Sequence, residues 1–238
     1  MCLTCHRFVP DRRQFFSLCL AGLTAVSAIG EVPASAASDR TSVTSDDAIE
    51  RLKSGNQKYV SAPEVCEFDL SKQRERVRKA QAPWATILTC SDSRLLPDLI
   101  FGGVNLGELF IARNAGNIVD TDILGTVEYG AEHLGIPLIV VLGHEACGAV
   151  TAACSVIEKH EKFPGSIGPL VDAIVPAAKA VYGKPGDFVD NTVRENAKRA
   201  AVKIAAKSRI VSHLIHAKKV KVLAARYDLD SGKVEFLT

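Results

Sequence analysis

The sequence predicts an α/β fold: a single domain with a central, mostly parallel sheet and an antiparallel edge strand, flanked by helices and preceded by an N-terminal helical arm. Short apolar runs rich in β-branched residues alternate with segments of helical composition, an order typical of parallel sheets covered by helices. The closing segment has an Asp/Ser/Gly turn between two extended stretches, which indicates an antiparallel hairpin. With 238 residues, 47% of them hydrophobic, the chain can bury a sizeable core.

Two helices are expected ahead of the first strand. Ser45, followed by two acidic residues, marks the start of a helix over 46–60. The apolar face of this helix is only partial and consists of Ile49, Leu52, Gln57 and Tyr59. A helix of this kind can pack on a partner subunit as readily as on its own core. A second, charged helix is expected over 71–80.

Strands and helices then alternate to the end of the chain. Strands are expected over 86–90, 109–113, 138–143 and 220–227. Helices are expected near 96–101, 121–134, 148–161, 167–182 and 188–217. The runs at 86–90 and 138–143 are short, apolar and β-branched, which is typical of parallel strands buried on both faces.

The N-terminus has the features of an export signal. Arg12 and Arg13 stand ahead of two phenylalanines and an apolar stretch that ends near Ile29. Residues 34–36 read Ala-Ser-Ala, the small-x-small form of a cleavage site. The alternative is a retained membrane anchor, although the apolar stretch is shorter than the roughly 20 residues that a membrane span needs.

These features divide the chain into three parts. Residues 1–36 are predicted to be a twin-arginine-type export signal that is removed, 37–45 a linker and 46–238 the folded domain. Export places the protein in a bacterial periplasm or a thylakoid lumen, and membrane association stays open. The formal net charge is +2, which argues against a nucleic-acid partner.

Two motifs carry the chemistry. Cys90-Ser-Asp92-Ser-Arg94 follows the first expected strand, and His144-Glu-Ala-Cys147 follows the third. Both stand at the carboxyl ends of strands, where open α/β sheets bind ligands. In an extended segment alternate residues project to one side, so Cys90, Asp92 and Arg94 are expected to share a face. His144 and Cys147 are expected to meet across a first helical turn.

These side chains indicate a zinc site. Two thiolates and one imidazole leave a tetrahedral zinc ion one ligand short, the pattern of a catalytic site. Asp92 leaves two interpretations open, because it either closes the site as a conditional fourth ligand or, when Arg94 pairs with it, leaves the metal to water. Zinc-bound water would lose a proton to become a nucleophilic hydroxide. Two thiolates neutralise the charge of the metal, so activity is expected to favour alkaline pH.

At these residues the chain resembles the β-class carbonic anhydrases, whose pattern is Cys-x-Asp-x-Arg followed by His-x-x-Cys. The similarity runs from about Asp46 to the C-terminus. It implies one zinc ion per subunit, held by Cys90, His144 and Cys147. It also implies reversible hydration of CO2 to bicarbonate and a proton, by attack of zinc-bound hydroxide on CO2.

The resemblance further implies roles for three side chains and for a partner subunit. Asp92 and Arg94 would form a gating dyad. Gln81 matches the position of a family glutamine whose amide binds substrate near the metal. The expected assembly is a homodimer, or a dimer of dimers, in which the N-terminal helices embrace the partner.

Two rival functions remain. The same fold and zinc site would suit a hydrolase of carbonyl sulfide or carbon disulfide, since the metal ligands do not separate these linear substrates from CO2. A catalytically silent zinc-binding interaction protein is the other rival. Asp92, Arg94 and Gln81 argue against it, because a structural zinc needs none of them.

Overall fold

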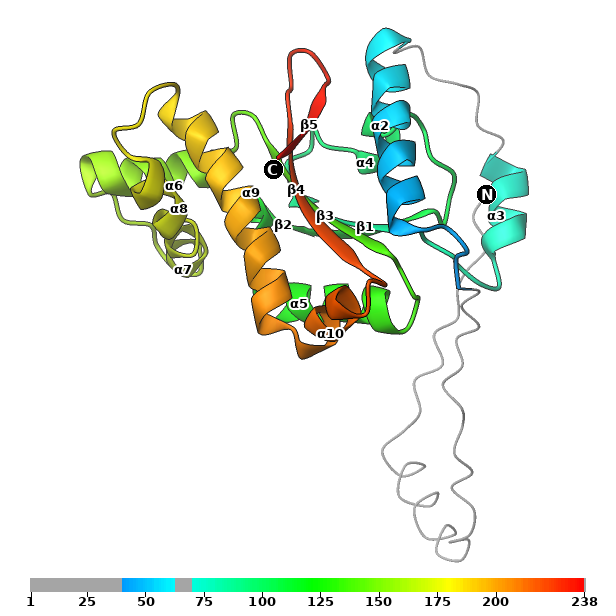
Figure 1. The fold of residues 1–238 in the computed structure, drawn as a ribbon. Helices are drawn as coiled ribbons and strands as arrows, with labels where there is room; N and C mark the ends of the chain where they lie inside the picture. The colour runs from blue at the N-terminus through cyan, green and yellow to red at the C-terminus, as the bar shows by residue number, and fades with distance from the viewer. Residues whose placement is uncertain (1–39, 63–69, 238) are drawn as a thin grey trace, which may run out of the picture. The chain divides into compact units, whose positions relative to one another are not determined.

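The computed structural model describes residues 40–62 and 70–237, which form an α/β structure around one five-stranded sheet (Figure 1). The predicted export signal, 1–36, and the first residues of the linker lie outside the described residues. The strands are β1 (Ala85–Cys90), β2 (Leu109–Asn114), β3 (Leu138–His144), β4 (Lys221–Tyr227) and β5 (Val234–Leu237). Their order in the sheet is β2-β1-β3-β4-β5.

The pairing of the strands confirms the predicted fold class. Strands β1 to β4 are parallel to one another, and β5 runs antiparallel to β4 with Tyr227 opposite Val234. Every residue of β1 and of β3 is buried, because both strands lie inside the sheet with helices on both faces. Thr89 in β1 is paired with Leu142 in β3, so these two strands end at almost the same height.

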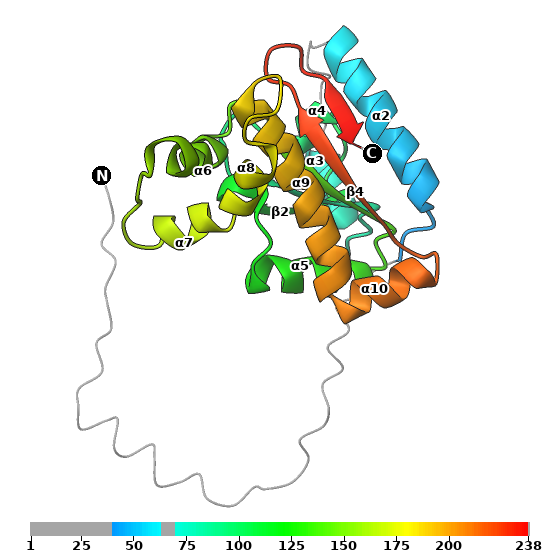
Figure 2. The ribbon, with the colours of Figure 1, turned by 60° about the vertical axis from the view of Figure 1, so that its left-hand side comes forward.

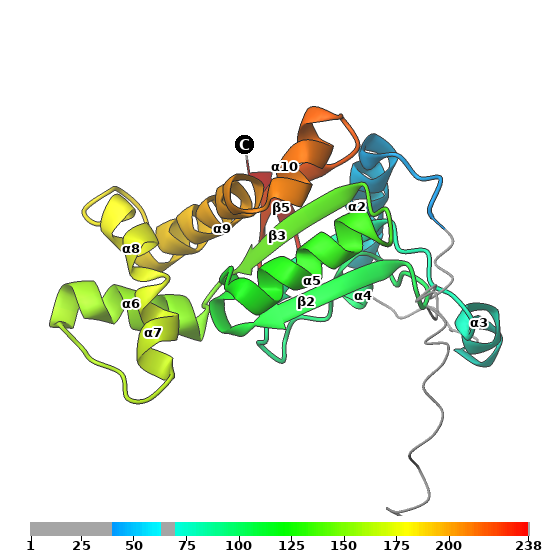
Figure 3. The ribbon, with the colours of Figure 1, turned by 90° about the horizontal axis from the view of Figure 1, so that it is seen from below.

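Helices cover both faces of the sheet, as Figures 2 and 3 show. On one face lie α2 (Ser45–Ser61) and the short α4 (Pro97–Ile100), which share a buried apolar cluster with β1, β3 and β4. On the other lie α5 (Thr121–Glu132), α9 (Phe188–Lys207) and α10 (Arg209–His216). Helices α6 (Gly148–Lys159), α7 (Ile167–Asp172) and α8 (Val175–Val181) pack together near the carboxyl end of β3.

Two long helices predicted from the sequence are each divided in the structure, and this corrects the prediction. The segment 167–182 forms α7 and α8, and Pro176 stands at the start of α8, where its missing N–H costs nothing. The segment 188–217 breaks at Ser208, which has an extended backbone. The Ser208 hydroxyl accepts a hydrogen bond from Val211 N at 2.9 Å and so caps α10. The break lets α9 and α10 contribute to the same apolar cluster.

The N-terminal helix α2 packs on the core of its own chain. Leu52 is fully buried, and Gly55 touches the residue after α4 so closely that an added Cβ would lie 2.0 Å from Phe101 O. The polar contact on this face comes from Asn56. The predicted face included Gln57, which is exposed, because the twist of the helix turns Asn56 inward instead.

Asn56 joins α2 to two distant parts of the chain. Its side-chain amide donates to Ile100 O at 3.1 Å and to Gly232 O at 2.8 Å, and its oxygen accepts from Val234 N at 2.8 Å. The hairpin between β4 and β5 is therefore tied to α2 and α4 by one buried side chain.

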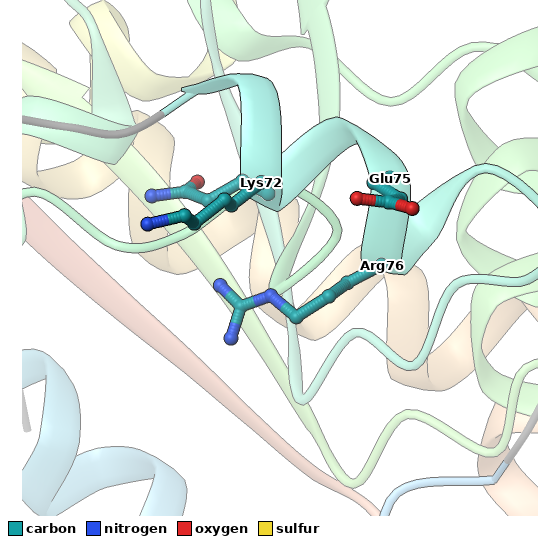
Figure 4. A pocket seen from close by; sticks show the side chains of 4 residues that line it. Lys72, Glu75 and Arg76 are labelled. Carbon is teal, nitrogen blue, oxygen red and sulfur yellow. The ribbon is translucent and has the colours of Figure 1, made fainter.

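The described part of the chain contains no helix with both the length and the apolar character needed to cross a membrane. A hollow of about 450 Å³ lies on α3 (Leu70–Val77). Lys72, Glu75 and Arg76 line it, and the side chains of Lys72 and Arg76 extend toward the same side of the helix (Figure 4). None of the predicted site residues lines it.

Substituting Asn56→Ala is expected to lower the free energy of unfolding by roughly 2 to 3 kcal/mol, because it leaves buried backbone groups without partners. Urea denaturation at fixed protein concentration measures the loss. Gln57→Ala, one residue along and exposed, is the matched control and should change the unfolding free energy by no more than about 0.5 kcal/mol. Equal midpoints for the two variants would show that the amide does not tie the hairpin to α2.

Candidate metal centre

Three of the predicted ligands come together where β1 and β3 end. Cys90 is the last residue of β1, His144 is the last residue of β3, and Cys147 precedes α6 as its N-cap. All three are buried, and their ligand atoms lie within 4.8 Å of one another. The two Sγ atoms are 4.0 Å apart. Elsewhere in the described residues, no group of His, Cys, Asp or Glu side chains is gathered in this way.

The hydrogen bonding of His144 determines its tautomer. Nδ1 lies 2.8 Å from the main-chain oxygen of Glu145. A carbonyl oxygen can only accept, so Nδ1 carries the proton and Nε2 carries the free lone pair. Nε2 is buried and has no hydrogen-bond partner in the structure.

An unpaired buried nitrogen beside two thiols fits a zinc ligand set. Buried polar groups are nearly always paired, and an exception needs an explanation. A neutral imidazole with its lone pair free, together with two sulfur atoms, is the donor set that zinc prefers. The residues present therefore fit a Cys-His-Cys zinc site, which Nε2 of His144 would complete.

The two thiols share one proton unequally. Hydrogen bonding from the Cys147 thiol is the largest influence that lowers the pKa of Cys90, and the main-chain N–H of Gly116 acts in the same direction. The pKa of Cys147 is raised, first by its hydrogen bond to Cys90 and then by burial. A thiolate is thus favoured at Cys90 over Cys147, and a metal that binds both sulfur atoms must displace the protons they carry.

The segment after β2 supports Cys90. Gly116 N donates to Cys90 Sγ at 3.3 Å, and Gly116 O accepts from Asn196 Nδ2 at 2.9 Å. Gly116 has a φ of 74°, and an added Cβ would lie 2.5 Å from Ile174 Cδ1. Only glycine fits this turn, because a side chain would both strain the backbone and clash.

Arg113 holds the main chain of the first motif. Its Nε donates to Cys90 O at 3.0 Å and its Nη2 to Asp92 O at 2.8 Å. The sequence motifs predicted no role for Arg113, Gly116 or Asn196. For the first two a signal was available, since Arg113 is the next-to-last residue of β2 and Gly116 follows that strand, at the same edge of the sheet as Cys90.

Asp92 and Arg94 form a two-point ion pair beside the ligand group. Arg94 Nε donates to Oδ1 at 2.9 Å and Nη2 to Oδ2 at 2.7 Å. The side-chain hydrogen bonds from Arg94 hold the pKa of Asp92 far below its usual range. Asp92 Oδ2 lies 4.0 Å from His144 Nε2, and Arg94 also donates to Ala146 O at 3.3 Å. An ionised carboxylate therefore stands next to the metal ligands, aimed by arginine.

Gln81 is not near the ligand group of its own chain. It is exposed and lies before the first residue of β1, whereas Cys90 is the last residue of that strand. A strand rises about 3.3 Å per residue, so the length of β1 separates the two residues. The structure therefore does not bring Gln81 to the Cys-His-Cys group of its own chain.

The chain is similar to known carbonic anhydrases. A sequence model described as carbonic anhydrase matches residues 85–234. A carbonic anhydrase of Mycolicibacterium smegmatis is 30% identical over 186 residues, which cover 77% of this chain and 89% of the relative. Carbonic anhydrase 2 of Mycobacterium tuberculosis is 31% identical over 182 residues, covering 76% and 87%.

Solved structures agree with the sequence comparison. A β-carbonic anhydrase of Coccomyxa, in complex with acetazolamide, superposes with a TM-score of 0.62 at 26% identity, covering 83% of this chain and 87% of that one. One of two tetrameric β-carbonic anhydrases of Sordaria macrospora matches with a TM-score of 0.61 at 22% identity, covering 81% and 97%. With the Cys-His-Cys group in place at the carboxyl ends of β1 and β3, these matches show that the chain belongs to the β-class carbonic anhydrase family of enzymes.

Proposed function

We propose that this protein uses zinc to catalyse the reversible hydration of CO2 to bicarbonate and a proton. The observation that carries the proposal is the unpaired, buried Nε2 of His144 in a group with two thiols. Cys90, His144 and Cys147 would hold one zinc ion per subunit. Bound there, zinc would supply the Lewis acid that lowers the pKa of a water molecule and so makes a nucleophile at moderate pH.

Asp92 orients the nucleophile in this proposal. Because Arg94 keeps Asp92 ionised, its carboxylate can only accept hydrogen bonds. The attacking water must therefore point its hydrogen at Asp92, which turns an oxygen lone pair toward CO2. Arg94 engages both carboxylate oxygens and so fixes the direction of this acceptor.

The same pair can act as a gate. Asp92 Oδ2 is 4.0 Å from His144 Nε2, so the carboxylate is close enough to become a conditional fourth ligand if it leaves Arg94. Half of the Arg94 side chain is exposed, and solvent can compete for the pair. The open form requires Arg94 to hold Asp92, and the closed form requires that contact to break.

We further propose that the protein works as a homodimer or as a dimer of dimers. The distance of Gln81 from its own Cys90 supports this, since a role near the metal then requires a second subunit. Leu96, Leu99 and Leu106 are exposed, which suits an interface. The similar β-carbonic anhydrase of Sordaria macrospora is tetrameric, which points the same way.

Only the N-terminal sequence supports a proposal about the compartment in which the protein works. We propose that the twin-arginine-type signal, 1–36, directs export and that the mature chain works in a periplasm or a thylakoid lumen. Cleavage of the signal would release the protein, and its retention would leave it on a membrane.

Purified protein with bound zinc is expected to hydrate CO2 in a stopped-flow assay, and Cys90→Ser should reduce kcat/KM by about two orders of magnitude together with its zinc content. The control is Cys154→Ser, since that buried thiol contacts Thr192 and lies outside the ligand group. Stoichiometric zinc without CO2 hydration would contradict the proposal, and turnover of carbonyl sulfide would then identify the rival hydrolase.

Asp92→Asn should lower kcat/KM by roughly 10- to 100-fold while zinc content stays the same, because the amide can no longer serve as an ionised acceptor. The depressed pKa of Asp92 keeps it ionised above the ordinary carboxyl pKa of about 3.9. Its titration therefore does not shape the rise of activity expected from about pH 6.5 to about pH 9. A pH profile of Asp92→Asn should be lower but parallel to the original, whereas exposed Asp122→Asn should leave it unchanged. A profile that loses its alkaline rise would assign that rise to Asp92 instead.

Mixing two inactive variants tests whether Gln81 acts across subunits. Gln81→Ala keeps its metal ligands, and Cys90→Ser keeps its Gln81. A mixed dimer regains one complete site if Gln81 serves the partner, so activity should return on mixing and reach about a quarter of the original in random reassociation. Gln81→Ala mixed with itself is the control. Mixed dimers that form but stay inactive would refute a role for Gln81 in the partner's site.

A further inference from the structure

A cluster of charged side chains lies at the carboxyl end of β4. Arg226 is its centre and is only 9% exposed. Its Nε donates to Asp190 Oδ1 at 2.6 Å, and its Nη1 donates to Asp228 Oδ2 at 2.6 Å. Its Nη2 lies 3.9 Å from Glu145 Oε1. We call Arg226, Asp190, Asp228 and Glu145 the β4 charge cluster.

The position of Arg226 needs an explanation. Its neighbours in β4, Ala225 and Tyr227, are buried on the other face of the sheet, whereas Arg226 faces Asp190 of α9 and is itself almost buried. Burying a cation there costs free energy unless carboxylates pair with it, and a buried ion pair is weak evidence for stability alone. In the sheet Arg226 is paired with Gly143, next to the pair formed by His144 and Tyr227. The cluster thus stands directly beside a proposed zinc ligand.

Glu145 connects the cluster to His144. Its main-chain N donates to Tyr227 O at 2.9 Å, and its Oε2 accepts from Leu229 N at 2.9 Å. Its other carboxylate oxygen faces Arg226. These contacts hold Glu145 against β4 at both its backbone and its side chain. The main-chain oxygen of the same residue accepts the proton of His144 Nδ1 at 2.8 Å.

We propose that Arg226 is a positioning residue for the metal centre, acting through Glu145 on His144. The inference rests on the proposed zinc ligation. By holding Glu145 in place, Arg226 keeps the carbonyl where it locks the Nδ1–H tautomer and the plane of the imidazole. Nε2 is then presented to the metal with its lone pair free. Groups that fix a ligating histidine in this way commonly change metal affinity by 10- to 100-fold.

Removing the guanidinium group of Arg226 would leave three carboxylates without the cation that they share. Glu145, Asp190 and Asp228 all face Arg226, and of these Arg194 reaches only Asp190, at 2.8 Å. Repulsion among the three is expected to displace Glu145. The carbonyl would move with it, and His144 would be free to change tautomer or turn.

The test compares Arg226→Met with Arg194→Met. Both remove a cation from Asp190, but only the first removes the contact with Glu145. The zinc dissociation constant is measured by chelator competition at neutral pH, and the absorption spectrum of the Co²⁺-substituted protein reports ligand geometry. We expect Arg226→Met to bind zinc about 10- to 100-fold more weakly with an altered Co²⁺ spectrum, and Arg194→Met to match the original protein. The ¹⁵N shifts of His144 in the metal-free protein should show a mixture of tautomers only in Arg226→Met.

Each outcome separates this proposal from the proposed function. If the original protein binds no zinc through Cys90, His144 and Cys147, the zinc proposal itself fails. If the original binds zinc and a folded Arg226→Met binds it equally well with an unchanged spectrum, the positioning role is refuted. Should Arg226→Met not fold, Glu145→Gln decides, because it keeps the acceptor for Leu229 N but removes the attraction to Arg226. Unchanged zinc affinity in that variant overturns the proposal.

Discussion

The constraint on which the site depends is that two adjacent parallel strands end side by side. The pairing of Thr89 with Leu142 brings the last residues of β1 and β3, Cys90 and His144, to one edge of the sheet. The turn after β3 then returns Cys147 to the same place as the N-cap of α6. Strand pairing thus brings three donor atoms from two distant segments together before any metal contributes.

The backbone around this edge is organised to present those atoms. Gly116 donates to the Cys90 sulfur, Arg113 holds the main chain of the first motif, and the Glu145 carbonyl holds the second. Two of these contacts come from the end of β2 and the third from the residue that follows β3. The side chains that line the centre are therefore positioned by neighbours that would not touch the metal or substrate themselves. This division explains why a site with so few reacting groups needs a large surrounding structure.

The polar and charged groups around the candidate site are buried at one end of the sheet, and their burial lowers the stability of the folded protein. An unpaired nitrogen, a shared thiol proton and a nearly buried arginine all lie within the same end of the fold. Packing elsewhere compensates: β1 and β3 are buried throughout, and α2 closes one face with Leu52 and Asn56. The apolar core can therefore hold a polar centre that is not stable by itself.

Local patterns in the sequence were sufficient for the order of strands and helices, the hairpin at the C-terminus and the two motifs. Strand and helix periodicity and the spacing of Cys90, His144 and Cys147 are properties of short segments, so they can be read along the chain. What the tertiary structure decided depends on residues far apart: Asn56 rather than Gln57 facing inward, the break at Ser208, the tautomer of His144 and the burial of Arg226. Asn56 meets Gly232 and Arg226 meets Asp190 only after the chain has folded. No local pattern encodes such pairs, because the free energy that selects them comes from contacts between separate elements.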